Sequence, residues 1–259
     1  MRLDRALRLD VGRALRSRPI QLYLGTQLAA AVVFVARRGE GVASTVLLIW
    51  LGLLVVAFLA WWAGRHRAAH PEPDPVPAAG PRTVFALVVV VALVVWGFGW
   101  SAEVGFVLLL LGAGGWVWSA IRAGALSGSR ERLTRDPRPF VGLYLFIALP
   151  RLLAIGPLYL LGVGLALPSG IIQQLLLLLG LFAPLEAWSR RPGWSALVAA
   201  ALFALLHVPT VLEPNHDDLV AAFANVALFQ LSVGLIAILA YRRHRAAVPI
   251  GVAHALAIG

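Results

Sequence analysis

Polar side chains capable of acid–base or metal chemistry are rare within the apolar stretches of this 259-residue chain. Gln173 and Gln174 stand together at the head of a leucine run, while His207 lies in FALLHVP and His254 in VPIGVAHALAI. Because an unpaired polar group is costly in hydrocarbon, each one is a candidate for function or for a contact between helices. The complete set within or at the edge of apolar segments is Glu103, Arg151, Gln173, Gln174, Glu186, His207, Asn225, Gln230 and His254.

Simple structural roles account for several members of this set. Arg151, next to Pro150, is expected to form a structural ion pair or to extend its charge to the membrane surface. Glu186 is expected to pair with Arg190 one helical turn later. Solvation at a segment boundary, or hydrogen bonds between helices, explains the others: Glu103, Asn225 and Gln230.

The two histidines are harder to assign to a structural role. A single histidine in an apolar helix is usually a hydrogen-bonded core residue, but this chain has two histidines in apolar segments of its last part, His207 and His254. Neutral imidazole is a common metal ligand, and Phe203 and His207 share one helix face. A core role and a metal-binding role therefore both remain open.

The composition predicts the elements that must position these residues. The chain is 60% hydrophobic, has a mean hydropathy of +0.85 and is only 13% charged, against about 25% in soluble domains. Its apolar stretches have the length of membrane-crossing helices. We predict an all-α polytopic membrane bundle of about eight transmembrane helices, over residues 20–36, 42–64, 83–101, 103–121, 140–167, 170–188, 194–212 and 219–241, with a short segment at 247–259. The fifth of these, interrupted at Pro150 and Arg151, could instead be two shorter pieces.

The 22 basic residues are all arginine and lie in short clusters between the apolar segments. This arrangement indicates membrane topology rather than nucleic-acid binding, and it places the N-terminus in the cytoplasm. We expect an integral protein of a bacterial inner membrane. The chain has no cysteine, which excludes disulfides, thiolate metal ligands and a cysteine nucleophile.

Four regions are predicted along the chain. An N-terminal basic segment and two-helix hairpin cover 1–64, and a linker with five prolines covers 65–82. Two transmembrane helices and an arginine-rich loop occupy 83–139. The candidate functional core covers 140–259.

The core resembles the CAAX prenyl protease and bacteriocin-processing family of intramembrane metalloproteases, known as CPBP or Abi proteins. That family has a Glu-Glu-x-x-x-Arg motif on one helix, Phe-x-x-x-His on the next, and a late His-x-x-x-Asn preceded by Pro-Ile. FALLH at 203–207 matches the second motif, and PIGVAH at 249–254 matches the start of the third, with Ile258 in the asparagine place. The resemblance implies that His207 and His254 hold a metal, with zinc as the candidate, or its bound water.

The first motif has two candidate positions, and neither one matches fully. In LEAWSR, Glu186 and Arg190 match but Leu185 replaces the first glutamate; in QLLLLL, Gln174 takes that place. Counting from the arginine turn at 189–193, Gln174 and His207 both lie about 20 Å deep, whereas Glu186 lies about 3 Å deep. The counting therefore favours Gln174 as the partner of the histidines, and Glu186 could serve only if its helix bends.

Three functions are open as alternatives. The first is an intramembrane zinc metalloendopeptidase that processes peptide tails or leaders of membrane or exported proteins, with Gln174, Glu186, His207 and His254 as its candidate catalytic residues. The second is a catalytically impaired pseudoprotease that binds hydrophobic or lipidated peptides, since an amide cannot act as a general base near neutral pH. The third is a small transporter. Expected partners are a peptide or protein within the membrane and the lipid bilayer, without nucleic acid.

Overall fold

The computed structural model describes residues 17–39, 138–212 and 218–258, with a few positions inside 46–50 and 104–118. All of the elements in these residues are helical, which confirms the predicted all-α class for this part of the chain. Three described helices are long and apolar enough to cross a membrane: Arg18–Arg38, Leu158–Ser189 and Leu219–Arg242. The predicted crossings at 42–64, 83–101 and 103–121, the linker at 65–82 and the first 16 residues lie outside, or almost entirely outside, the described residues.

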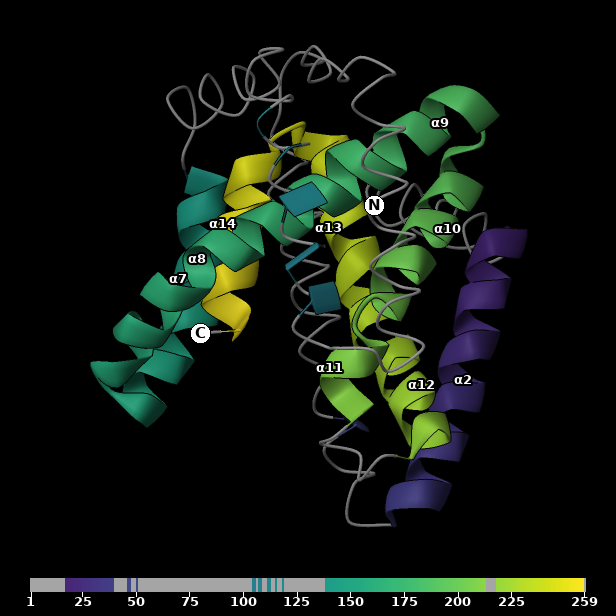
Figure 1. The fold of residues 1–259 in the computed structure, drawn as a ribbon, viewed down its shortest axis with the longest axis horizontal. Coiled ribbons are helices and arrows are strands. Elements are labelled where there is room, and N and C mark those ends of the chain that lie inside the picture. The colour runs from purple at the N-terminus through teal and green to yellow at the C-terminus, as the bar shows by residue number, and fades with distance from the viewer. Residues whose placement is uncertain are drawn as a thin grey trace, which may run out of the picture.

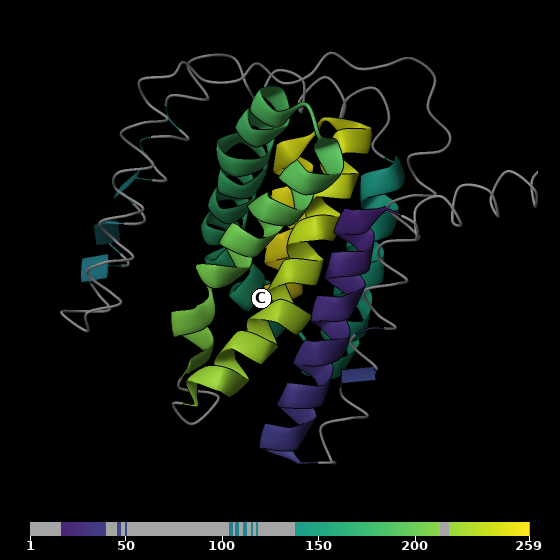
Figure 2. The ribbon, with the colours of Figure 1, turned by 90° about the vertical axis from the view of Figure 1, so that its right-hand side faces the viewer.

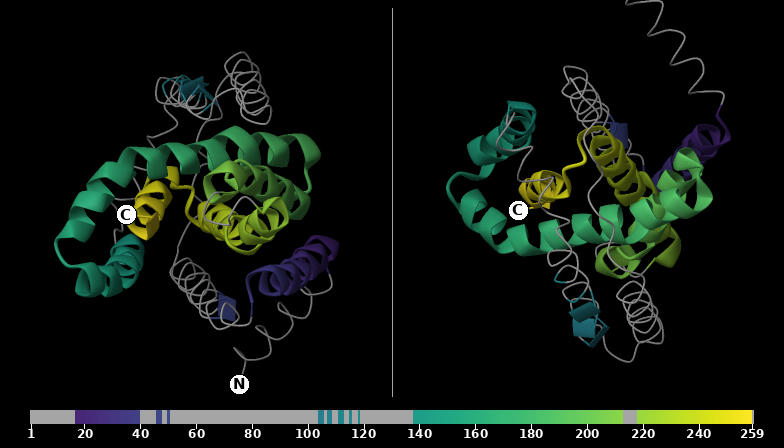
Figure 3. Two further views of the ribbon diagram at one scale, coloured as in Figure 1. Left: turned by 60° about the horizontal axis from the view of Figure 1, so that its bottom comes forward. Right: turned by 90° about the horizontal axis from the view of Figure 1, so that it is seen from above.

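The candidate core is built on one long, bent helical path (Figure 1). α8 (Leu158–Leu175) continues without a break into the π-helical segment η2 (Leu176–Phe182) and then into α9 (Ala183–Ser189). Figure 3 shows this path arching across the width of the bundle, with α7 (Arg138–Ile155) and the C-terminal α14 (Ala247–Ile258) beside its first part. α14 packs most extensively against α8.

The second part of the bundle surrounds the other end of the arch. α10 packs on α13, and α2 packs along α12, as Figure 2 shows for the purple N-terminal helix. Gln27 of α2 donates to the carbonyl of Ala227 on α12, and the hydroxyl of Tyr23 is hydrogen-bonded to that of Ser232 on α13. The elements concerned are α2 (Arg18–Arg38), α10 (Pro192–Leu205), α11 (Val208–Leu212), α12 (Leu219–Leu228) and α13 (Gln230–His244).

The predicted boundary between the fifth and sixth crossings is wrong. The chain turns back at Gly156 and Pro157, not near 168, and Pro150 lies inside α7 without ending it. Gly156 has φ of 75° and its N–H donates to the carbonyl of Leu152, which is a common way for a helix to end. Pro157 then prevents the earlier helix from continuing.

One end of the bundle collects most of the described arginines. A Cβ on Gly193 would lie 3.4 Å from Pro19, which places the start of α2 beside the start of α10. The rings of Phe140 and His244, with centroids 5.3 Å apart, bring the start of α7 to the end of α13. We call this the basic end, and it carries Arg18, Arg138, Arg190, Arg191, Arg242 and Arg245.

The opposite end holds Arg37 and Arg38 at the end of α2. Arg37 lies 3.6 Å from the carboxylate of Asp218, which also accepts hydrogen bonds from two N–H groups in the first turn of α12. The segregation of arginines predicted from the sequence is therefore observed in the described helices. Which end faces the cytoplasm stays a prediction.

Two tyrosine hydroxyls attach α14 to the hairpin of α7 and α8. Tyr159 donates to the carbonyl of Leu256 at 2.7 Å, and Tyr144 donates to the carbonyl of Pro249 at 2.9 Å. Leu256 lies in the last turn of α14, where backbone carbonyls have no partner within the helix. Pro249 lies in the first turn, where carbonyls accept hydrogen bonds within the helix.

This difference predicts unequal effects of two otherwise identical substitutions. Tyr159→Phe is expected to lower the free energy of unfolding by about 1–2 kcal/mol, because the half-buried carbonyl of Leu256 loses its donor. Tyr144→Phe should cost under about 1 kcal/mol, because its acceptor keeps a helical partner. Denaturant unfolding of both variants in the same detergent checks this, and equal losses would contradict the capping role of Tyr159.

Candidate functional site

The close crossing of α8 and α14 brings two candidate site residues together, Gln173 of α8 and His254 of α14. A Cβ on Gly170 would lie 2.8 Å from the backbone nitrogen of Ala255, and one on Gly251 would lie 2.7 Å from the Cα of Ile171. Both glycines therefore allow backbone-to-backbone contact that no larger residue permits. Close approach at small residues is a general feature of helix packing in membranes.

The end of α10 positions the third site residue, His207. α10 ends at Leu205, and His207 occupies the turn before α11 begins at Val208. The ring of His207 lies against that of Phe203, with centroids 4.6 Å apart, and Nδ1 is 2.8 Å from the carbonyl oxygen of Phe203. The Phe-x-x-x-His spacing therefore fixes the imidazole on its own helix.

Gln173, His207 and His254 form one hydrogen-bonded cluster. The Oε1 of Gln173 lies 3.2 Å from Nε2 of His207 and 3.1 Å from Nε2 of His254. The Nε2 of Gln173 lies 2.9 Å from the hydroxyl of Ser169. Phe203 also contacts the ring of His254, with centroids 6.3 Å apart. Two imidazoles and a neutral amide from three separate stretches therefore meet, but the amide is that of Gln173 and not that of Gln174, which the sequence favoured.

Hydrogen-bond balance decides which end of the amide faces the rings. If the oxygen faces them, both Nε2 atoms must carry protons, and a neutral His207 would then turn a bare Nδ1 toward the Phe203 carbonyl at 2.8 Å. An imidazolium would remove that conflict, but it would bury a cation in an apolar bundle. Rotating the amide removes this conflict: its two N–H bonds point at the two Nε2 lone pairs, its oxygen accepts from Ser169, and the Nδ1–H of His207 donates to the Phe203 carbonyl. We therefore assign neutral rings whose Nε2 lone pairs converge on one amide nitrogen.

The expectation that Gln174 joins the histidines is wrong by one residue. Gln174 is fully buried, at 0% exposure, and neither of its amide atoms has a hydrogen-bond partner within the part of the chain that the structure describes. Gln173 points in a different direction, because consecutive residues on a helix differ by about 100° in direction. Depth along the helix could not separate two adjacent residues.

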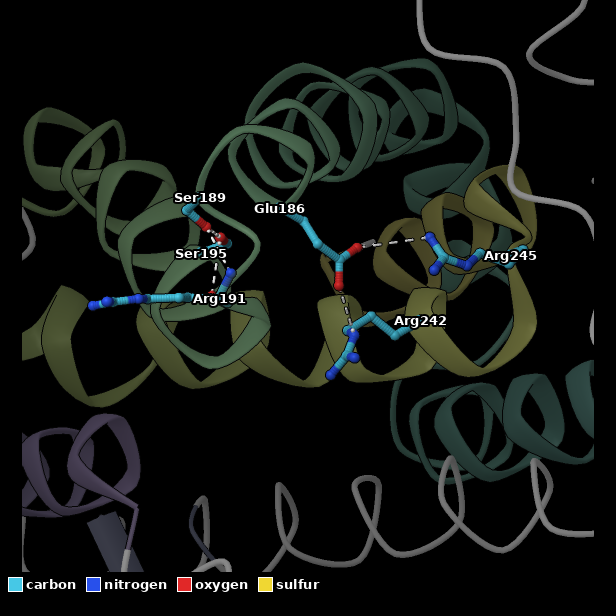
Figure 4. A network of polar contacts seen from close by, with 6 residues as sticks. All are labelled: Glu186, Ser189, Arg191, Ser195, Arg242 and Arg245. Atoms are coloured by element: carbon cyan, nitrogen blue, oxygen red, sulfur yellow. Dashed lines mark hydrogen bonds and ion pairs between the residues drawn. The ribbon is translucent and has the colours of Figure 1, made fainter.

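The expected ion pair of Glu186 with Arg190 is also wrong. The carboxylate of Glu186 lies 3.1 Å from Nε of Arg242 and 3.9 Å from a guanidinium nitrogen of Arg245, at the basic end (Figure 4). Arg190 instead ends α9 in the left-handed conformation, with its N–H bonded to the Glu186 carbonyl. Glu186 therefore links α9 to α13, and the LEAWSR motif does not reach the histidines.

The described residues offer two ligands of the kind that zinc prefers at this site. Catalytic zinc usually takes three protein ligands from histidine, carboxylate or thiolate. Within residues 17–39, 138–212 and 218–258, no group of three such side chains comes together, and Gln173 fills the position between the two imidazoles. This donor set does not complete a zinc site, so zinc binding by His207 and His254 stays a prediction.

Other features of the site were not recognised in the sequence. Ser169, one turn before Gln173, fixes the amide, and the i,i+4 spacing of the two was the available signal. The π-helical segment directly after the glutamines has no sequence signal that we can identify. Of the remaining polar candidates, Glu103 lies outside the described residues, while three are half-buried and have no hydrogen bond to the cluster: Arg151, Asn225 and Gln230.

Comparison with known proteins does not assign the chain to a family. No family model matches it, and neither a curated protein nor a solved structure is similar to it. A functional assignment therefore depends on the geometry of the site.

Proposed function

We propose that this integral membrane protein is a non-catalytic, CPBP-like protein that binds an apolar peptide segment between its helices. The observation that carries this proposal is the amide of Gln173 placed between the Nε2 atoms of His207 and His254. A metalloprotease needs an ionisable base and a metal-bound water at such a point. Here a neutral group occupies it.

The position of Gln173 also suggests how the sequence relates to the family pattern. With Gln173 in the place of the first glutamate, Gln174 takes the second and Leu178 takes the arginine place, while Ile258 remains in the asparagine place. Both glutamate places, the arginine place and the asparagine place are then changed, and the two histidines are the polar motif residues that are kept. Such a pattern is typical of a fold retained without its chemistry.

Peptide binding is supported by the partial exposure of the cluster. Gln173 and His207 are half-buried rather than sealed, although the surrounding helices are apolar. An extended peptide inside a membrane must have hydrogen-bond partners for its backbone. An amide and two imidazoles can supply both donors and acceptors.

Replacing Gln173 by glutamate tests whether the missing carboxylate is what prevents metal binding at the cluster. Gln173→Glu is expected to bind about one zinc per chain, because it supplies the third ligand that two imidazoles lack. The unchanged protein should retain far less zinc after the same purification, and Gln173→Glu with His254→Ala should lose it again. The measurement is metal content by mass spectrometry. Stoichiometric zinc in the unchanged protein, removed by His254→Ala, would overturn the proposal.

Peptide capture tests the binding role. Apolar peptides of about 20 residues with a photoreactive side chain are expected to cross-link to the protein in lipid nanodiscs, near Gln173. Gln173→Leu should reduce capture there, and Gly164→Ala, at an exposed position of the same helix, should not. Capture unaffected by Gln173→Leu would contradict binding at this cluster.

A second candidate is the intramembrane metalloendopeptidase itself. The observation that favours it is the convergence of two Nε2 atoms within 3.2 Å of one point. The same zinc measurement separates the two functions, because only the endopeptidase requires metal in the unchanged protein.

A further inference from the structure

The turn between α9 and α10, with sequence WSRRPGW at 188–194, brings two arginines and two tryptophans together at the basic end of the bundle. Trp188 is 84% exposed and Trp194 is 37% exposed. Tryptophan is enriched where a membrane protein meets the lipid headgroups. The two indoles therefore indicate that this turn lies at headgroup level.

Two arginines of this turn have no acidic partner among the described residues. Glu186 and Asp218 are the two acidic side chains in that part of the chain. Glu186 is engaged by Arg242 and Arg245, and Asp218 lies at the opposite end. Within the described residues the exposed guanidinium groups of Arg190 and Arg191 are thus left uncompensated, and Figure 4 shows Arg191 extending away from the Glu186 network.

Hydrogen bonds hold the turn in a defined shape. The hydroxyl of Ser189 accepts from the N–H of Arg191 at 3.0 Å and lies 2.7 Å from the hydroxyl of Ser195. Ser195 in turn donates to the carbonyl of Arg191 at 3.2 Å (Figure 4). Because Ser195 is buried, these contacts fix the backbone from which both arginines project.

We propose that the Trp188–Trp194 turn binds the phosphate headgroup of an anionic phospholipid. Guanidinium groups form paired hydrogen bonds with phosphate oxygens, and exposed tryptophans place that phosphate at the level of the lipid headgroups. Charge complementarity supplies the attraction, because an anionic leaflet draws basic residues to its surface. This site is separate from the histidine cluster and does not depend on the function proposed for it.

The test uses the full chain and two matched arginine pairs. Arg190→Gln with Arg191→Gln removes the pair in the turn, while Arg37→Gln with Arg38→Gln removes the adjacent pair at the opposite end. Binding of phosphatidylglycerol and of phosphatidylcholine is measured by native mass spectrometry of each purified protein. The first double variant is expected to bind phosphatidylglycerol about 30-fold more weakly, with unchanged binding of phosphatidylcholine. The second should change it little.

Three results would overturn the proposal. One is unchanged phosphatidylglycerol binding in the variant of the turn, and another is an equal loss in the control variant, which would indicate a general charge effect. The third comes from inorganic phosphate added at the same ionic strength as chloride. If phosphate displaces the lipid more strongly than chloride does, the turn is a site for soluble anions.

Discussion

Gln174→Glu is expected to leave little folded protein, whereas Gln174→Leu is expected to be more stable than the unchanged chain. The side chain at 174 is 0% exposed and has no hydrogen-bond partner among the described residues. An unpaired carboxylate there should lower the free energy of unfolding by about 3–5 kcal/mol, the cost of an uncompensated buried charge. Leucine removes an unsatisfied amide instead, and should raise it by about 1–3 kcal/mol.

The neighbouring glutamine provides the matched control. Gln173→Leu should be destabilising, because it leaves the Nε2 atoms of His207 and His254 without their shared partner. Thermal unfolding of the three variants in one detergent checks the opposite signs. Equal destabilisation by leucine at 173 and at 174 would show that Gln174 also has an essential partner.

Gly251→Ala is expected to force α14 away from α8 and to disrupt the histidine cluster. The added Cβ would lie 2.7 Å from the Cα of Ile171, a backbone atom that cannot move without moving its helix. Overpacking of this kind typically costs about 1–3 kcal/mol, and the loss of the contact between Gln173 and His254 adds to it. Gly170→Ala should behave alike, because its Cβ would meet the backbone of Ala255 at 2.8 Å.

Gly164→Ala is the control for this prediction. Gly164 lies on α8 as well, but a Cβ there has no atom within 4 Å. Alanine should therefore be neutral, or stabilising by up to about 1 kcal/mol through its higher helix propensity. The melting temperatures of the three variants give the comparison. A Gly251→Ala protein as stable as Gly164→Ala would show that α8 and α14 are not in backbone contact.

The depth of the site could be predicted because helix rise is constant. Counting residues from the arginine turn placed the glutamines and His207 at one level and Glu186 far from it. The choice between Gln173 and Gln174 could not be made in this way, since they differ by only about 1.5 Å in depth. Their directions differ by about 100°, and packing decides which direction faces His254.

The predictions of one helix boundary and of one ion pair failed for a related reason. Proline at 150 suggested a break, yet α7 continues through it and ends just before Gly156, whose positive φ the sequence does not reveal. Glu186 and Arg190 have the spacing of an ion pair, but Arg242 and Arg245 come close to Glu186 from another helix. Local spacing reports only which contacts a helix allows, whereas neighbouring helices compete for the same side chains.

Composition and the lengths of the apolar segments alone predicted an all-helical membrane protein with its arginines segregated by side and with His207 and His254 in apolar segments, because these properties depend on the solvent around each segment. Tertiary structure alone decided that Gln173 joins His207 and His254, that Gln174 is buried without a partner among the described residues, and that Glu186 belongs to the basic end. Those outcomes depend on the direction of each side chain and on contacts between helices distant in sequence. Neither is encoded in the pattern of any one segment.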